Sequence, residues 1–244
     1  RCKRATWGLT SYRSKVPSRS YMNSVVRLTL RNTPAQEQRL SALQQAFAQV
    51  CNALAPVVQQ TRCWNRVALH HMAYKPLRQR FPELGSQMIC NAIYSVSRTC
   101  RIVYQHPSSP FNLGRLGDRA LPRVQFLPQS PVYFDRHTLS IKDGQASMFT
   151  LDGRMKFQLD LTPDYEERFR TEKLREIVLD RAGGRFRLSF QFAAPAEDGD
   201  APIATEEAAA NGELPEYVIV TDDPPLPMPA ELAMAATHLP SHAP

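Results

Sequence analysis

Apolar residues alternate with polar ones early in the chain and then recur at helical spacing. Val25–Leu30 alternates enough to predict a short strand. Thr33 is a favoured N-cap residue, Pro34 suits the first helical position, and Gln36 completes a capping box with Thr33. We expect Pro56 to kink or end this helix near its last turn. The apolar positions that predict its buried face are Leu40, Leu43, Phe47, Val50, Leu54 and Val57.

Two further helices are predicted before Pro107. One spans roughly residues 63–80 and is stopped by Pro82. The next begins near Ser86 and ends before Pro107. Its apolar side is formed by Met88, Ile89, Ala92, Ile93, Val96, Cys100 and Val103. The stretch after it, up to Pro122, is rich in Pro, Gly and Ser and predicts a basic loop.

The period of the apolar positions changes to two after this loop, which predicts strands. The expected strands are Arg123–Phe126, Val132–Phe134, Thr138–Lys142, Gln145–Thr150, Met155–Leu161, Leu174–Arg181 and Arg185–Phe192. Asp143-Gly144 and Asp152-Gly153 are turn sequences, and Gly183-Gly184 closes the last hairpin. The polar segment Thr162–Lys173 predicts either a loop or a short exposed helix.

Charge is distributed unevenly along the 244 residues, whose net charge is +7. Residues 195–244 hold ten acidic residues, no Lys or Arg, and nine of the 20 prolines. A segment with so little apolar surface cannot offset its ordering entropy, so we expect a disordered tail with one strand-like patch, Tyr217–Val220. Such a tail would either compete with nucleic acid for the basic body or be a passive extension.

Residues 1–194 therefore carry a charge of +17, and residues 22–194 still carry +11. We expect residues 1–21, which precede Met22, to be a disordered leader or an added expression segment. A body this basic favours a polyanionic partner, which usually means nucleic acid, although a basic surface can also be merely solubilising.

The sequence offers no active site, cofactor motif or metal motif. Asp160, Asp164 and Glu166 fall in a polar turn, where solvated carboxylates are the norm. His70 and His71 are adjacent, whereas a metal-binding pair on a helix needs to be four residues apart. The five cysteines form no C-x-x-C pair and indicate reduced, structural residues of a cytoplasmic protein. The sequence contains no run of 18 apolar residues, so no membrane span is predicted.

Arginine and aromatic residues are interleaved on the second and third helices. Arginine binds phosphates through its planar fork, and exposed aromatic rings stack on unpaired bases. The alternative is that Trp64 and Tyr104 lie in the core and the arginines form a solvated face. The candidate RNA- and DNA-binding residues are Arg62, Arg66, Lys75, Arg78, Arg98, Arg101, Arg115, Arg119, Arg123, Lys156, Arg181, Arg185 and Arg187.

The order of these motifs resembles the N-terminal half of the TnpB (OrfB) transposon-associated proteins, which are RNA-guided nucleases related to type V CRISPR effectors. The resemblance covers about residues 25–194. It rests on Thr33–Leu40, Cys51-Asn52, Tyr74–Arg78, Phe81–Gln87, Asn91–Ile93 and the closing hairpin around Gly183-Gly184. The family's metal-dependent nuclease domain and paired cysteines would follow this hairpin, but here the acidic, proline-rich tail follows it.

The resemblance implies an α+β fold with a β-barrel-like wedge domain, interrupted by a three-helix insert and followed by the disordered tail. The wedge would comprise residues 22–31 and 123–194. The helical recognition-like insert, together with its basic loop, would comprise residues 32–122. The tail would comprise residues 195–244. In the family, the wedge grips the guide RNA and the helical part contacts the guide–target duplex. By carry-over, Arg123, Lys156, Arg181, Arg185 and Arg187 would face RNA, and Arg62, Arg66, Lys75, Arg78, Arg98 and Arg101 the duplex.

We therefore expect a cytoplasmic, non-catalytic protein without cofactors that holds a structured guide-like RNA and its DNA target. One alternative is a truncated transposase remnant, or one subunit of a split nuclease whose cutting half is a separate chain. Another is a basic protein–protein adaptor. A nearby gene for a nuclease domain or a structured non-coding RNA would favour the guide-binding or split-nuclease function.

Overall fold

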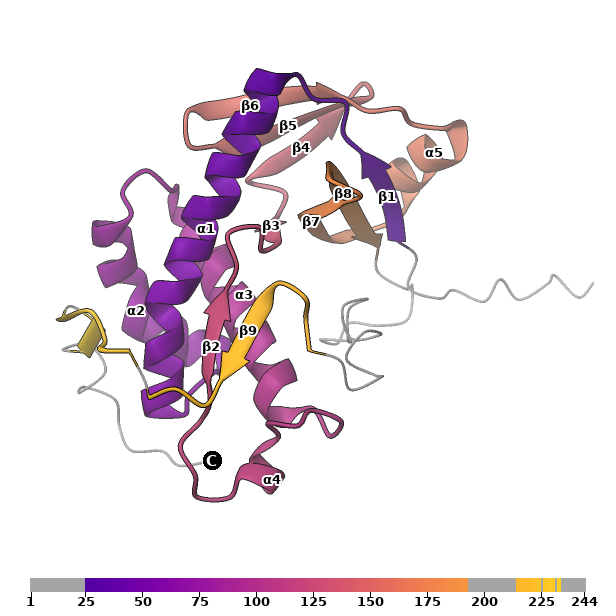
Figure 1. Cartoon of the computed structure of the whole chain (residues 1–244). Helices are drawn as coiled ribbons and strands as arrows, with labels where there is room; N and C mark the ends of the chain where they lie inside the picture. The colour runs from indigo at the N-terminus through magenta and orange to yellow at the C-terminus, as the bar shows by residue number, and fades with distance from the viewer. Residues whose placement is uncertain (1–24, 193–213, 225, 231, 234–244) are drawn as a thin grey trace, which may run out of the picture.

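Five helices and three small antiparallel sheets form the structure, a computed structural model that describes residues 25–192, 214–224, 226–230 and 232–233 (Figure 1). The three long helices fall between the first two strands, and most of the remaining strands follow them. The chain is therefore an α+β protein. The segment expected to be a leader, residues 1–21, lies outside the described residues.

Helix α1 (Pro34–Thr61) begins where its sequence predicts. The Thr33 side chain accepts from the Gln36 amide and the Gln36 side chain accepts from the Thr33 amide, which completes the capping box. Pro56 was expected to kink or end the helix, and the second of these alternatives is wrong, because α1 continues to Thr61 with Pro56 inside it. Val57 and Val58 beyond the proline are fully buried, and this packing holds the last turn in place.

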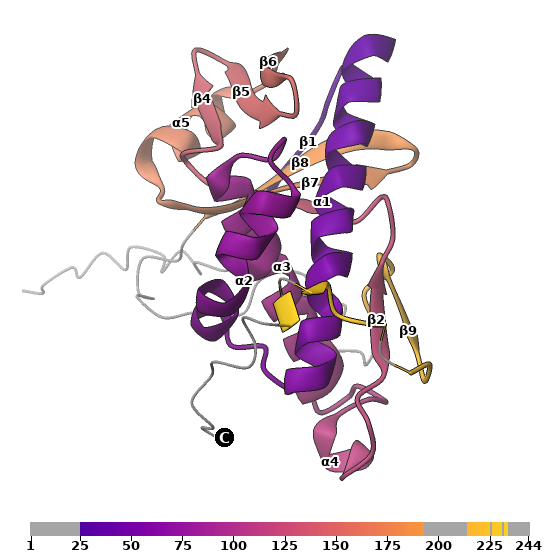
Figure 2. The same ribbon diagram turned by 90° about the vertical axis from the view of Figure 1, so that its left-hand side faces the viewer.

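Helix α3 (Ser86–Gln105) packs against α1, and α2 (Arg66–Arg80) packs against α3 (Figure 2). Helix α2 starts three residues later than predicted. Asn65 caps it by accepting from the amides of Val67 and Ala68, at 3.0 and 3.1 Å. Trp64, just before the cap, is buried against the ring of Tyr104. The expected basic loop contains one short helix, α4 (Leu113–Leu116).

The largest sheet has the strand order β1-β8-β7-β3 and a second sheet the order β4-β5-β6. Phe169 of α5 (Pro163–Thr171) packs edge-on against Phe190 and Phe192 of the first sheet. In the turn between β4 and β5, Asp143 and Gly144 both have positive φ, which explains the Asp-Gly pair. The strands are β1 (Val25–Thr29), β3 (Val132–Phe134), β4 (Leu139–Lys142), β5 (Gln145–Thr150), β6 (Gly153–Gln158), β7 (Leu174–Ala182) and β8 (Arg185–Phe192).

These strands do not close into the barrel expected from the sequence. Among the described residues, the four-stranded sheet ends on β1 and β3, and β4–β6 pair only with one another. A barrel needs each edge strand to find a partner at a consistent tilt and register. Here β3 has only three residues, which is too short to bridge the sheets.

Part of the acidic tail is folded onto the body, so the expectation of a wholly disordered tail is wrong. Strand β9 (Val218–Thr221) pairs antiparallel with β2 (Arg123–Phe126) and confirms the strand-like patch in the sequence. Asn52 of α1 exchanges two hydrogen bonds with the backbone of Phe126, at 2.7 and 2.8 Å. Strand β2 is thus held between a helix and the C-terminal segment.

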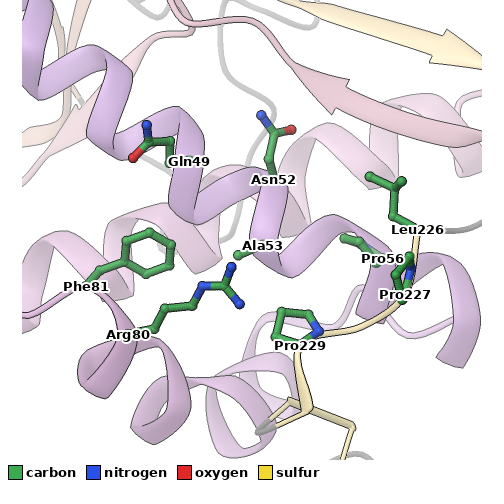
Figure 3. A pocket seen from close by; sticks show the side chains of 9 residues that line it. All are labelled: Gln49, Asn52, Ala53, Pro56, Arg80, Phe81, Leu226, Pro227 and Pro229. Carbon is green, nitrogen blue, oxygen red and sulfur yellow. The ribbon is translucent and has the colours of Figure 1, made fainter.

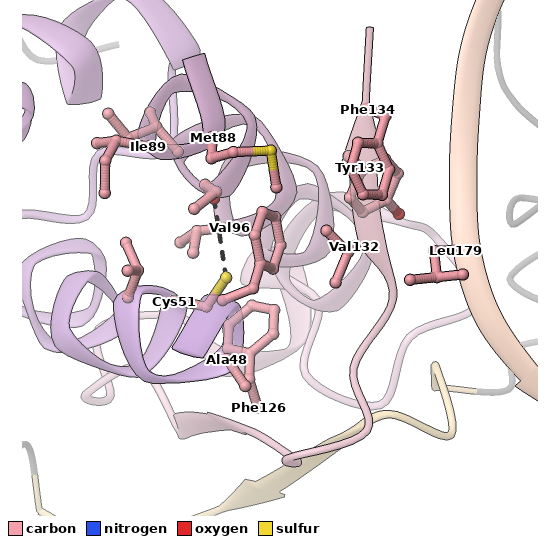
Figure 4. Close-up of a cluster of buried hydrophobic side chains, with 14 of the residues drawn as sticks. Ala48, Cys51, Met88, Ile89, Val96, Phe126, Val132, Tyr133, Phe134 and Leu179 are labelled. Atoms are coloured by element: carbon pink, nitrogen blue, oxygen red, sulfur yellow. Dashed lines mark hydrogen bonds between the residues drawn. The ribbon is translucent and has the colours of Figure 1, made fainter. Parts of the chain in front are cut away.

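One continuous hydrophobic core joins the helices to the sheets. Figure 4 shows its centre, where side chains from α1 and α3 face those from β2, β3 and β7. The thiol of Cys51 points at the carbonyl of Ala92, with sulfur and oxygen 3.9 Å apart. Burial raises the pKa of Cys51 to about 12 and also raises that of Cys100, so both thiols stay protonated and act as small apolar groups.

Candidate nucleic-acid interface

Positive charge is concentrated in the helical part of the protein. Residues 62–119 hold nine basic and two acidic residues, whereas residues 123–192 hold twelve and ten. The excess seen in the sequence therefore belongs mainly to α2, α3 and the α4 loop. The strands predicted to face RNA are close to electrically balanced.

Four of the predicted binding residues are held by carboxylates inside the described structure. Arg187 forms a two-pronged pair with Asp180 in the β7–β8 hairpin, at 2.7 and 2.9 Å. Arg123 pairs at 2.9 Å with Asp223 of the C-terminal segment. Each such pair reduces the charge available to a phosphate.

Arg181 is the third of these residues. Its guanidinium lies 4.0 Å above the Phe186 ring, donates to Ser41 at 2.7 Å and pairs with Glu37 at 3.4 Å. These contacts join the hairpin to the start of α1, so Arg181 has a structural role.

Arg98 is the fourth, and it lies inside the protein. Its Nη1 is 3.3 Å from both carboxylate oxygens of Glu176, and both residues are buried. Burial raises the pKa of Glu176 above its usual range, and the Arg98 guanidinium opposes that rise. Arg98 therefore joins α3 to β7 and is not placed to contact nucleic acid.

The remaining basic residues of the helical part have no carboxylate ion-pair partner within the described ranges. They are Arg62, Arg66, Lys75, Arg78, Arg80, Arg101, Arg115 and Arg119. All are exposed except Arg78, which is half-buried. Of the predicted residues on the strands, Lys156 and Arg185 are likewise exposed and without such a pair. Arg80 was not among the predicted RNA- and DNA-binding residues, although its position at the end of a basic helix was a reason to include it.

Three of these arginines form a cluster around α4, which we call the α4 cluster. Arg62, in the left-handed conformation just after α1, donates to the Arg119 carbonyl at 2.7 Å. Arg119 donates to the Arg115 carbonyl at 3.0 Å, and Arg115 to that of Pro107 at 3.1 Å. Backbone carbonyls orient these guanidiniums without cancelling their charge, so the cluster can bind an anion.

A second group runs along one side of α2 and is called here the α2 stripe. Arg66, His70, Tyr74 and Arg78 are spaced four residues apart and so share one helix face. The rings of His70 and Tyr74 are stacked, with centroids 4.8 Å apart and an interplanar angle of 19°. Sequence reasoning considered His70 only as half of a histidine pair, and the four-residue spacing was the signal that would have revealed the stripe.

A pocket of about 380 Å³ separates the end of α2 from the C-terminal segment (Figure 3). Arg80 projects into it from α2, Gln49 and Asn52 line it from α1, and Pro229 and neighbouring residues line the opposite wall. Gln60 of α1 donates to the Leu226 carbonyl at 3.1 Å, which helps hold this wall. The C-terminal segment thus forms part of the molecular surface next to the basic helix.

The acidic residues considered for catalysis do not converge. Asp160 pairs with Arg31 at 2.8 Å, while Asp164 and Glu166 are exposed in the first turn of α5. Within the described ranges, no group of three His, Cys, Asp or Glu side chains could hold a metal ion. None of the helices in that part of the chain has both the length and the apolar character that a membrane crossing requires.

Comparison with protein-family models and with curated proteins gave no match for this chain.

Proposed function

We propose that this protein is a non-catalytic RNA-binding protein whose helical part holds the phosphates of a structured RNA. The observation that carries the proposal is the charge of residues 62–119. Eight exposed or half-exposed basic side chains lie there without an ion-pair partner in the described structure. Such a surface has a favourable interaction with a polyanion and releases the counterions condensed on it.

The α4 cluster and the α2 stripe supply different chemistry for this function. The α4 cluster presents three guanidiniums fixed by backbone carbonyls, which suits phosphate contacts. The α2 stripe combines two guanidiniums with two stacked rings, which suits contacts to both phosphates and bases. The order of elements and the resemblance to TnpB proteins support a guide-like RNA with a DNA target as the natural ligand.

A salt titration of RNA binding by the full chain tests this function. A fluorescent RNA hairpin should bind at about 50 mM salt and weaken steeply towards about 200 mM, because each neutralised phosphate releases counterions. Replacing Arg62, Arg115 and Arg119 with Gln should weaken binding and reduce the slope of log affinity against log salt by about two.

The control is the double variant Lys156→Gln and Arg185→Gln, which removes two exposed charges from the strands, one fewer than the test variant removes. It should change the slope by less than about one, since the strands carry little excess charge. Absence of binding at low salt, or affinity that does not depend on salt, contradicts the proposed function. Equal effects of the two sets of substitutions would show that the strands contribute as much as the α4 cluster, which contradicts an interface in the helical part.

A further inference from the structure

A second pocket, of about 280 Å³, lies between the first turns of α2 and α3. It is lined by Arg66, Val67 and His70 from α2 and by Gln87, Cys90 and Ile93 from α3. This volume is slightly below the usual range for sites that enclose drug-sized molecules. The pocket therefore suits a single small ring system.

The walls of the pocket offer both apolar and planar surfaces. Two apolar side chains line it: Val67, which is 64% exposed, and Ile93, which is buried. The Arg66 guanidinium lies 5.0 Å from the centre of the Tyr94 ring, and the His70 ring is stacked on Tyr74. The ring contacts orient both side chains before any ligand arrives, which reduces the entropy lost on binding.

The polar groups at the pocket match the edge and backbone of a nucleotide. The Gln87 amide has both donors and an acceptor, as the edge of a nucleobase does. Arg66 and Arg78 lie at the two ends of the α2 stripe, with Lys75 one residue beyond Tyr74. The helix carrying these cations contains no acidic residue. An anionic backbone running along α2 would therefore meet a cation on each side of the pocket.

We propose that the α2–α3 pocket receives one unpaired base of a single-stranded RNA segment, stacked against His70, with its flanking phosphates on the α2 stripe. This inference rests on the proposed function and adds to it a preference for single-stranded over double-stranded RNA. A base inside a duplex has both faces covered by its neighbours, so only an unpaired nucleotide can enter. The α4 cluster, which contacts phosphates alone, has no such preference.

The test compares a short single-stranded RNA with a blunt RNA duplex of the same length, each bound to the full chain at about 50 mM salt. His70→Ala should weaken single-strand binding about tenfold, the loss expected for one stacked base, and duplex binding by less than about twofold. His70→Phe keeps a flat ring and should restore single-strand binding. His137→Ala, which removes an exposed histidine from the turn before β4, should alter neither affinity. Equal melting temperatures would show that the variants are folded.

The outcomes separate this inference from the proposed function. Equal weakening of both probes by His70→Ala, or no weakening of either, overturns the pocket while RNA binding by the protein stands. Failure of His70→Phe to restore binding also overturns it, because stacking is then not the interaction lost. If the unsubstituted protein binds neither probe, the proposed function fails and the pocket fails with it.

Discussion

The guanidinium of Arg98 and the carboxylate of Glu176 meet inside the protein, with Nη1 3.3 Å from both carboxylate oxygens. They join α3 to β7 at a point where the relative exposure of the residues is 8% and 6%. A buried charge is tolerated only when its partner remains, so the two residues depend on each other. This contact connects the helical part of the fold to its largest sheet.

Glu176→Ala should therefore lower the free energy of unfolding by about 3 kcal/mol, because it removes both of the oxygens that accept from the buried Arg98 guanidinium. Chemical denaturation measures the change. Asp160→Ala removes the carboxylate of the exposed pair with Arg31 and should change stability by less than about 1 kcal/mol. Equal losses in the two variants would contradict the role assigned to burial.

The same carboxyl group predicts a pH dependence of stability. Burial raises the pKa of Glu176 above the ordinary value of 4.5, so the folded state keeps its proton at pH values where the unfolded chain has lost it. The folded state then binds more protons, and the free energy of unfolding falls as pH rises from about 4.5 to the raised pKa. Denaturation across this range should show a falling contribution in the wild type that is absent in Glu176→Gln. A contribution that rises with pH would contradict the direction of the shift.

The docking of the C-terminal segment depends on one face of β9. Val218 is 8% exposed, whereas Ile219, its neighbour on the other face of the strand, is 45% exposed. Val218→Asp buries an unpaired charge and should destabilise the docked segment by about 3 kcal/mol or more. Ile219→Asp adds the same charge at the surface and should have an effect of about 0.5 kcal/mol at most. Amide exchange in β2 measures the release, and similar exchange in the two variants would contradict it.

Purified protein should not cleave DNA or RNA when magnesium or manganese is added. Cleavage by two metals needs carboxylates grouped around the ions, but Asp160, Asp164 and Glu166 are exposed and directed to different partners or to solvent. The measurement is incubation of a labelled substrate with protein and metal. Metal-dependent nicking that Asp164→Ala abolishes would refute this prediction and would place a catalytic group in α5.

Local signals in the sequence predicted the elements well, because each depends on a few neighbouring residues. The capping box of Thr33 and Gln36 marked the start of α1, and the Asp143-Gly144 pair marked a turn with two positive φ angles. Both features need no knowledge of the rest of the fold. The bounds of β2 and β3 agree with the predicted strands for the same reason.

Long-range relationships could not be predicted in this way. The pairing of β2 with β9 joins segments that lie far apart in the sequence, with strands β3 to β8 between them. Strand β9 also lies in a segment whose composition indicates disorder. The pairing between the strand segments VIVT and RVQF covers only four residues, which is too short to be recognised from the sequence. The role of Arg98 was missed for a related reason, because its partner Glu176 is 78 residues away and burial is decided by both.

Strand β1 is synthesised before its partner β8, which follows about 160 residues later. At roughly 5–20 residues per second, the ribosome takes on the order of ten seconds or more to deliver that partner. During this interval β1 is an unpaired edge that can associate with other nascent chains. The helices are complete much sooner and can form locally, so the four-stranded sheet is the step at which chaperones should most affect the yield of folded protein.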